Sequence, residues 1–169
     1  MTEVLVGIGS NIERHRNIAL AASQLRQYFG EVRFSPVFEA EAIGFKGDPF
    51  FNLVAQFECD VSLIELQRIL KAIEAQSGRT GQESKWSGRT LDIDILTFGN
   101  VVGVIEGIVL PRPEILENAY VLQPLAMLVP GHCHPEQGLT YQTLWDDFKG
   151  HRALTLTQEA SVLLGASAL

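Results

Sequence analysis

The sequence is poor in cysteine and contains no long apolar run, and each absence argues against a class of protein. Cys59 and Cys133 stand far apart, which indicates isolated thiols rather than a disulfide framework or a thiolate metal centre. No segment approaches the roughly 18 apolar residues of a membrane-spanning helix. The start, MTEVLVGIGSNIERH, lacks the basic and apolar regions of a secretory signal. We therefore expect a cytoplasmic protein.

Positive charge is also scarce. The chain has 13 Lys and Arg against 20 Asp and Glu, a formal net charge of −7 and a pI near 5.0. Nucleic acids and anionic membranes need a basic surface, so we expect neither as a partner. We expect small-molecule substrates and a monomer or weak dimer, and any anionic ligand must meet a local basic patch.

Two common catalytic signatures are missing as well. The segment GIGSNI is neither a Walker A motif nor a complete GxGxxG, so Gly7, Gly9 and Ser10 predict a tight turn into a helix rather than a phosphate cradle. No arrangement of a Ser, Cys or His nucleophile is apparent, and the HCH at 132–134 predicts a polar loop. The chemistry must come from other residues.

The length and composition fit one domain. A chain of 169 residues with 46% hydrophobic content is long enough for one compact core and short for two, so we expect a single domain over 1–169. The tail at 151–169 has a helix-compatible and a strand-compatible half. It is treated as a C-terminal extension that either packs on the body or mediates association.

Strand and helix patterns alternate along the chain. A helical stripe follows the first strand, and a second helix has a capping box at Ser62 and Glu65 and ends near Gly78. This order predicts a ferredoxin-like α+β sandwich: a mainly antiparallel four-stranded sheet with an extra hairpin and helices on one or both faces. We expect the face away from these two helices to be free for a ligand. The predicted strands are 4–10, 32–41, 50–59 and RTLDIDIL at 89–96, with 101–110 as hairpin partner of the last.

An acidic pair interrupts the fourth of these strands. Because strand side chains alternate, Leu91, Ile93 and Ile95 point to the core while Asp92 and Asp94 share the opposite face. Their mutual repulsion is on the order of 3 kcal/mol at an effective dielectric near 20. Solvation on an open sheet face is one interpretation. The other is a Mg²⁺ site, since Mg²⁺ binds one or two carboxylates and takes further oxygens from substrate phosphates.

Basic and aromatic residues just upstream favour the metal and phosphate interpretation. Arg79, Lys85 and Arg89 concentrate positive charge in an acidic chain, and arginine binds phosphate through a planar fork. Each arginine could instead cap a helix or pair with a surface acid. Trp86 could cover a flat heteroaromatic substrate or anchor the core.

These motifs together resemble a known family. GIGSNI, FEAEAIG followed by PFFN, KW before RTLDIDIL, and AYVLQPLAMLVP occur in the order and spacing of the 6-hydroxymethyl-7,8-dihydropterin pyrophosphokinases of folate biosynthesis, over roughly residues 3 to 135. The resemblance implies the ferredoxin-like fold. It also implies Mg²⁺-dependent transfer of pyrophosphate from ATP to the hydroxymethyl oxygen of the pterin, with release of AMP.

The resemblance also implies roles for individual residues. Asp92 and Asp94 match ligands of two Mg²⁺ ions, and with Arg79 and Arg89 they form the expected catalytic set. Nucleotide or phosphate contacts are expected from Glu74, Arg79, Arg89 and Arg112. The positions matching the pterin site are Ile43, Gly44, Phe50, Asn52, Trp86 and Tyr120.

The chain departs from the family pattern after the predicted hairpin. The usual Pro-His-Pro-Arg reads Pro-Arg-Pro-Glu, so Arg112 replaces a histidine, while Glu114 and Asn118 replace arginines. Gly81 stands where a loop arginine or lysine is common, and Ser87-Gly88 replaces Gly-Pro. Arg112 could supply the lost donor, but fewer loop cations weaken charge stabilisation. The alternative is therefore a divergent paralogue that binds a pterin or nucleotide with weak or no transfer.

Overall fold

The computed structural model describes residues 1–40, 48–78, 91–150, 154–161 and 164. None of the helices in this described part is long and apolar enough to cross a membrane. Several predicted site residues lie outside the described residues: Ile43, Gly44, Arg79, Trp86 and Arg89.

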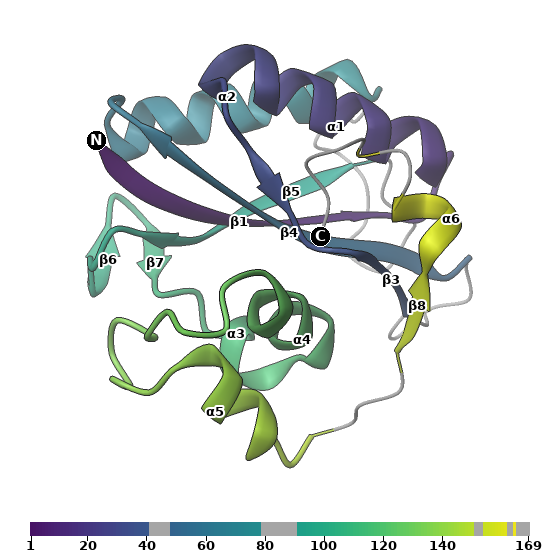
Figure 1. Cartoon of the computed structure of the whole chain (residues 1–169). Coiled ribbons are helices and arrows are strands. Elements are labelled where there is room, and N and C mark those ends of the chain that lie inside the picture. Colours follow the sequence, from purple (N-terminus) through teal and green to yellow (C-terminus); the bar gives the residue numbers. More distant parts are fainter. Residues whose placement is uncertain (41–47, 79–90, 151–153, 162–163, 165–169) are drawn as a thin grey trace.

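The described residues form a six-stranded antiparallel sheet at the centre of the fold (Figure 1). The helices α1 (Arg14–Phe29) and α2 (Leu63–Gln76) follow the first strand and the fourth. This connectivity confirms the predicted ferredoxin-like α+β sandwich. In spatial order the strands are β5 (Asp92–Phe98), β1 (Thr2–Ser10), β4 (Phe50–Cys59), β3 (Val37–Ala40) and β8 (Thr155–Thr157), with β2 (Arg33–Phe34) paired to β4 outside this path.

Both α1 and α2 lie on one face of the sheet (Figure 1). Leu25 of α1 and Leu66 and Leu70 of α2 are buried against the strands. Complete burial of each such side chain stabilises the fold by about 1.5–3 kcal/mol. The stripe of leucines therefore accounts for the attachment of the helices to the sheet.

The ends of α2 are those that the sequence predicts. The hydroxyl of Ser62 accepts a hydrogen bond of 3.2 Å from the backbone N–H of Glu65. Gly78 follows the helix with φ at 93°, a left-handed conformation that favours glycine. Both signals are local, which is why they could be predicted without knowledge of the tertiary structure.

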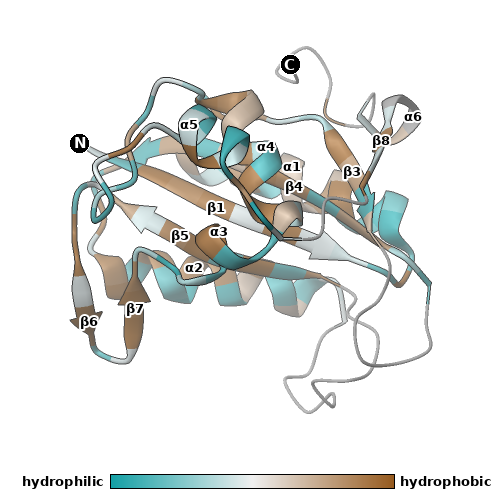
Figure 2. Cartoon of the chain, turned by 90° about the horizontal axis from the view of Figure 1, so that it is seen from below, coloured by the Kyte–Doolittle hydropathy of each residue, from teal (hydrophilic) through white to brown (hydrophobic). Residues whose placement is uncertain are grey.

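The opposite face of the sheet is partly covered. The helix α4 (Ala119–Leu128), preceded by α3 (Glu114–Glu117), packs against β4 and lies beside α5 (Tyr141–Asp146), in front of the sheet in Figure 2. Leu122 and Leu125 join Leu5, Val54 and Leu96 in a second buried cluster. The expectation that this face is free is wrong beneath α4, because a helix that is apolar on all sides has to be buried.

The segment at 101–110 pairs with itself. Its two halves, β6 (Gly103–Ile105) and β7 (Ile108–Leu110), form a separate two-stranded sheet, so the prediction that 101–110 pairs with β5 is wrong. The turn between them places Glu106 at φ 49° and Gly107 at φ 83°. Positive φ at both central residues is typical of a tight hairpin turn, which folds the segment back within ten residues.

Two other expectations about the strands need correction. The predicted strand at 4–10 is confirmed by β1, which contains Gly7 and Gly9 and continues to Ser10, so the tight turn expected at these residues is wrong. They are held in the strand because β1 pairs with β4 on one side and β5 on the other. The strand predicted at 32–41 consists of β2 and β3, separated by Ser35 and Pro36.

The C-terminal extension packs on the body. Its strand β8 pairs with β3, and Ala160, in α6 (Gln158–Ser161), is buried in the same cluster as the residues of α1 and α2. The hydroxyl of Ser161 accepts a hydrogen bond of 2.9 Å from the backbone N–H of Val37. The described residues of the extension therefore pack on the body of the domain, which is one of the two placements that the sequence left open.

Candidate active site

A polar row crosses the sheet on the face away from α1 and α2. In the strand register, Gly9 of β1 faces Asn52 of β4 on one side and Asp92 of β5 on the other. Two residues away along β1, Gly7 faces Asp94. Ile93, between the two aspartates, is 2% exposed in the core of the opposite face. The predicted alternation along this strand is confirmed.

Gly9 leaves room for the side-chain amide of Asn52, which lies against it. A Cβ atom at Gly9 would lie 3.2 Å from Oδ1 of Asn52, a contact that forces the amide to move. Glycine in a strand interior is weakening, and it often marks a place where another group approaches the backbone closely. Sequence reasoning missed this residue because GIGS suggests a turn. The predicted strand at 4–10 contains Gly9, but its place opposite Asp92 and Asn52 depends on strand pairing that the sequence does not specify.

Asn52 is nearly buried, with an exposed fraction of 9%. Its side chain makes no hydrogen bond with any other part of the described chain. Its neighbour in β3 is Phe38, also buried, and Phe50 lies on the same strand face two residues before it. A buried amide flanked by aromatic rings suits a flat ligand that supplies hydrogen-bonding groups at its edge.

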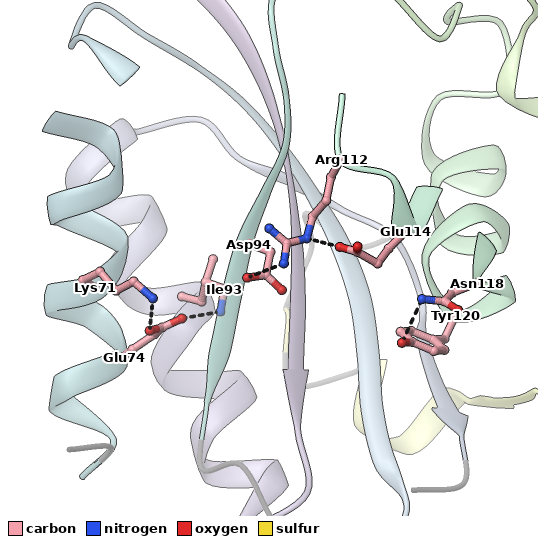
Figure 3. A network of polar contacts seen from close by, with 8 residues as sticks. All are labelled: Lys71, Glu74, Ile93, Asp94, Arg112, Glu114, Asn118 and Tyr120. Atoms are coloured by element: carbon pink, nitrogen blue, oxygen red, sulfur yellow. Dashed lines mark hydrogen bonds and ion pairs between the residues drawn. The ribbon is translucent and has the colours of Figure 1, made fainter. Parts of the chain in front are cut away.

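The two aspartates disfavour each other's charge. Burial, and then the negative charge of Asp92, raise the pKa of Asp94 to about 7. Arg112 acts in the other direction, with Nη2 at 3.7 Å from Oδ1 of Asp94 (Figure 3). A carboxylate pair with this electrostatic balance favours binding of a further cation.

Glu74 is buried, with an exposed fraction of 3%. Its Oε2 accepts a hydrogen bond of 2.7 Å from the backbone N–H of Ile93, and its Oε1 lies 3.5 Å from Nζ of Lys71 (Figure 3). Ile93 stands between the two aspartates, so this bond joins α2 to the backbone that carries both carboxylates. The carboxylate of Glu74 thus contacts the protein backbone at a place beside the acidic pair.

Arg112 follows the hairpin and contacts two acids. Its backbone N–H donates to the carbonyl of Leu96 over 2.9 Å, which fixes it beside β5. Its side chain forms an ion pair with Glu114 in addition to the longer contact with Asp94 (Figure 3). The arginine and glutamate that depart from the family pattern are therefore partners of each other.

Tyr120, on α4, lies near this charged group. Asn118 donates a hydrogen bond of 3.0 Å from Nδ2 to the hydroxyl of Tyr120 (Figure 3). Burial, and then the negative charge of Glu114, raise the pKa of Tyr120, so its hydroxyl stays protonated at neutral pH. Asn118, the other departure from the pattern, thereby orients the aromatic ring.

A pocket of about 270 Å³ lies between α2, β5 and the β6–β7 hairpin. Ile95 and the hairpin residues Ile108 and Val109 supply apolar walls, and Asp94 and Arg112 line its charged part. In the described part of the chain, no group of three or more His, Cys, Asp and Glu side chains is placed to hold a metal ion. The donors that the described residues offer to a divalent cation here are therefore the carboxylates of Asp92 and Asp94, and a bound ligand would add further oxygens.

A comparison with protein-family models shows which family this chain belongs to. Residues 5–130 match the model of 7,8-dihydro-6-hydroxymethylpterin-pyrophosphokinase, HPPK, which is more than half of the chain. The chain belongs to the HPPK family.

Curated HPPK relatives agree with this membership. The chain is 34% identical over 131 residues to the 2-amino-4-hydroxy-6-hydroxymethyldihydropteridine pyrophosphokinase of Pseudomonas aeruginosa, covering 75% of this chain and 80% of that protein. It is 30% identical over 125 residues to the enzyme of the same name from Bacillus subtilis, covering 72% and 74%. The predicted family and its pyrophosphokinase class are confirmed.

Solved structures give the same fold. A Plasmodium falciparum HPPK-DHPS structure with pteroate matches with a TM-score of 0.69 at 12% identity, over 86% of this chain and 42% of that chain. A second, with SDX-DHP, matches with a TM-score of 0.66 at 13% identity, over 86% and 43%. At these identities the likeness shows the fold alone.

Most of the predicted site residues that the structure describes lie on one side of the sheet in this HPPK fold. Asp92, Asp94 and Asn52 share the face away from α1 and α2, with Arg112 and Tyr120 beside them. Phe50 belongs to the same face, while Glu74 reaches the strand from α2. The residues that could hold a metal are Asp92 and Asp94.

Proposed function

We propose that this site transfers the terminal pyrophosphate of ATP to the hydroxymethyl oxygen of 6-hydroxymethyl-7,8-dihydropterin, with AMP as the leaving product. Membership of the HPPK family supports the reaction. The observation that carries the assignment to this site is the row of Asp92, Gly9 and Asn52 across three strands. It brings an acidic pair and an amide that makes no hydrogen bond within the described residues to the two sides of Gly9.

The nucleotide would occupy the pocket between α2 and the hairpin. Apolar walls from Ile95, Ile108 and Val109 suit the flat base. Arg112 at the charged part of this pocket suits the phosphates, since a guanidinium binds phosphate oxygens through a planar fork. This placement directs the phosphate tail toward Asp94.

The acceptor would lie against Asn52. The amide can donate to and accept from the edge of a pterin ring, which is the pairing that this nearly buried side chain lacks within the described residues. Phe50 and Tyr120 would contact the faces of the ring. The hydroxymethyl group would extend from Asn52 past Gly9 toward Asp92, since Asn52 and Asp92 flank Gly9 in the strand register.

Asp92 and Asp94 fit Mg²⁺ in donor chemistry and charge. Both are carboxylates on one strand face, and their mutual repulsion is relieved by a cation. When bound, Mg²⁺ would supply neutralisation of the triphosphate charge. We place up to two ions with these two residues, as the resemblance implies.

The remaining proposed contributors lie outside the described residues or act indirectly. Arg79 and Arg89 are proposed to stabilise charge on the transferred group, and Trp86, Ile43 and Gly44 to enclose the acceptor. Glu74 is proposed to influence the nucleotide site by fixing the backbone at Ile93.

We further propose that the chain acts as one domain over 1–169, in the cytoplasm, as a monomer or weak dimer. The burial of Ala160 and Leu164 in the main core supports inclusion of the C-terminal extension. The net charge of −7 supports a small-molecule enzyme over a nucleic-acid partner.

The identity of the nucleotide product tests the reaction. Purified protein is incubated with Mg²⁺, ATP and 6-hydroxymethyl-7,8-dihydropterin, and AMP and ADP are separated by chromatography. Attack at the β-phosphorus predicts one AMP for each pterin pyrophosphate and no ADP. Formation of ADP would contradict the reaction, and tight ligand binding without AMP would favour the divergent paralogue.

A further inference from the structure

Arg112 stands between two carboxylates from different elements. Its Nε pairs with Oε2 of Glu114, an oxygen shielded from solvent, at the first residue of α3. Its Nη2 lies 3.7 Å from Oδ1 of Asp94 on β5, beyond direct hydrogen-bond distance. The guanidinium is therefore held mainly by Glu114 and only loosely by Asp94 (Figure 3).

An untethered guanidinium would compete with a divalent cation. Among the cations of the described chain, Arg112 is the one that acts on Asp94, and Lys71 is engaged with Glu74. Asp94 is only one third exposed, so a direct guanidinium pair would occupy the carboxylate oxygens that a metal needs. A small movement of Arg112 toward β5 would make that pair.

We infer that Glu114 is a positioning residue that tethers Arg112 away from Asp94 and so keeps the Asp94 carboxylate open to a divalent cation. The inference rests on the proposed function, because it takes the acidic pair as the metal site. It assigns a purpose to the joint appearance of Arg112 and Glu114: the arginine reaches the phosphate side of the pocket, and the glutamate limits its reach.

Cation binding without turnover tests this tether. Mn²⁺, which shares the preference of Mg²⁺ for oxygen ligands, is titrated into nucleotide-free protein at pH 8, and free Mn²⁺ is measured by electron paramagnetic resonance. Glu114→Gln is expected to raise the Mn²⁺ dissociation constant about tenfold. Glu117→Gln removes the same charge from an exposed position of the same helix and is expected to change it less than about twofold.

The double variant separates tethering from simple charge. Without the guanidinium there is nothing to tether, so Arg112→Gln with Glu114→Gln is expected to bind Mn²⁺ as Arg112→Gln alone does. Equal weakening by Glu114→Gln in both backgrounds, or no weakening in either, would overturn the inference. If Glu114→Gln fails to fold, Glu114→Asp replaces it, because this substitution shortens the tether by one methylene. Its Mn²⁺ dissociation constant is then measured with Arg112 present and with Arg112→Gln.

The outcomes also separate this inference from the proposed function. If the wild-type protein binds no Mn²⁺, both the proposed metal site and the proposed tether are wrong. If the wild-type protein binds Mn²⁺ and Glu114→Gln leaves the dissociation constant unchanged, only the proposed tether is wrong. Circular dichroism and thermal unfolding of each variant establish that the binding differences arise in folded protein.

Discussion

The two faces of one sheet differ in what they bury. On the face beneath α1 and α2, β1 and β5 present Val6, Ile8, Ile93 and Ile95, each no more than 2% exposed. On the other face the same two strands present Gly7, Gly9, Asp92 and Asp94, next to Leu5 and Leu96 of the second buried cluster. Along each strand, residues that face the helices therefore stabilise the fold, while their neighbours on the other face, called the chemical face below, form the proposed active site. Substitutions on the chemical face should lower turnover, and substitutions on the apolar face should lower stability.

The glycines show that the chemical face is arranged at some expense of strand stability. Glycine weakens a strand interior, by roughly 0.5–1 kcal/mol relative to alanine. β1 tolerates Gly7 and Gly9 because it is paired on both sides and packed by the apolar residues of its other face. The packing of the first face thus compensates for the strand stability that these two glycines cost.

The largest expected effect is on the chemical face. Asp94→Ala should lower turnover about a thousandfold, equivalent to about 4 kcal/mol, because it removes one of two proposed metal ligands. Steady-state AMP release measures this loss. The melting temperature should not fall, since the substitution removes a like charge from a repulsive pair; a large loss of stability would break the comparison between faces.

The adjacent residue on the apolar face should behave in the opposite way. Ile93→Ala should lower the free energy of unfolding by about 3 kcal/mol, through lost burial and the cavity left in the core. Urea denaturation followed by circular dichroism measures it. Turnover of the protein that remains folded should stay within about fivefold of wild type. Activity lost at full stability would contradict the division of roles.

Gly9→Ala sharpens the comparison within the chemical face. The added Cβ would lie 3.2 Å from Oδ1 of Asn52, so we expect a KM for the pterin about tenfold higher and a KM for ATP changed less than about twofold. Gly7→Ala is the matched control, because its Cβ would meet Leu96 at an ordinary 3.5 Å. An equal rise of the pterin KM in both variants would argue against a specific role for Gly9.

The smallest expected effect is on the pH dependence of metal-free stability. The raised pKa of Asp94, about 7 against an ordinary 3.8, means that the folded protein binds this proton more tightly than the unfolded chain. The associated stability is present below pH 4 and is lost as the pH rises to about 7. Asp94→Asn should therefore be more stable than wild type by about 1 kcal/mol at pH 8, after allowance for solvent screening, and no more stable at pH 4. Thermal unfolding in chelator at both pH values measures this difference, and an equal gain at both would contradict the assigned pKa.

The sequence was sufficient where the determining signals are local. The alternation around Asp92 and Asp94 predicted both faces of β5, and Ser62 and Gly78 predicted the ends of α2. The order of strands and helices then led to the correct fold class. Each of these depends on residues within a few positions of one another.

Features that depend on distant pairing could not be predicted in this way. The segment at 101–110 has strand character, but alternation does not specify its partner, and the positive φ values at Glu106 and Gly107 are a matter of turn conformation. The GIGS segment signals a turn locally and is overruled by two neighbouring strands. The ion pair of Arg112 with Glu114 depends on how α3 begins after the hairpin.

The central claim is that the carboxylates of Asp92 and Asp94 hold a divalent cation against the phosphates of a bound nucleotide. A crystal structure of the protein with Mg²⁺, a non-hydrolysable ATP analogue and 6-hydroxymethyl-7,8-dihydropterin tests it most directly. We predict cation density coordinated by both carboxylates and by phosphate oxygens, with the pterin against Asn52. A fully liganded structure in which these carboxylates contact only protein or water would contradict the account.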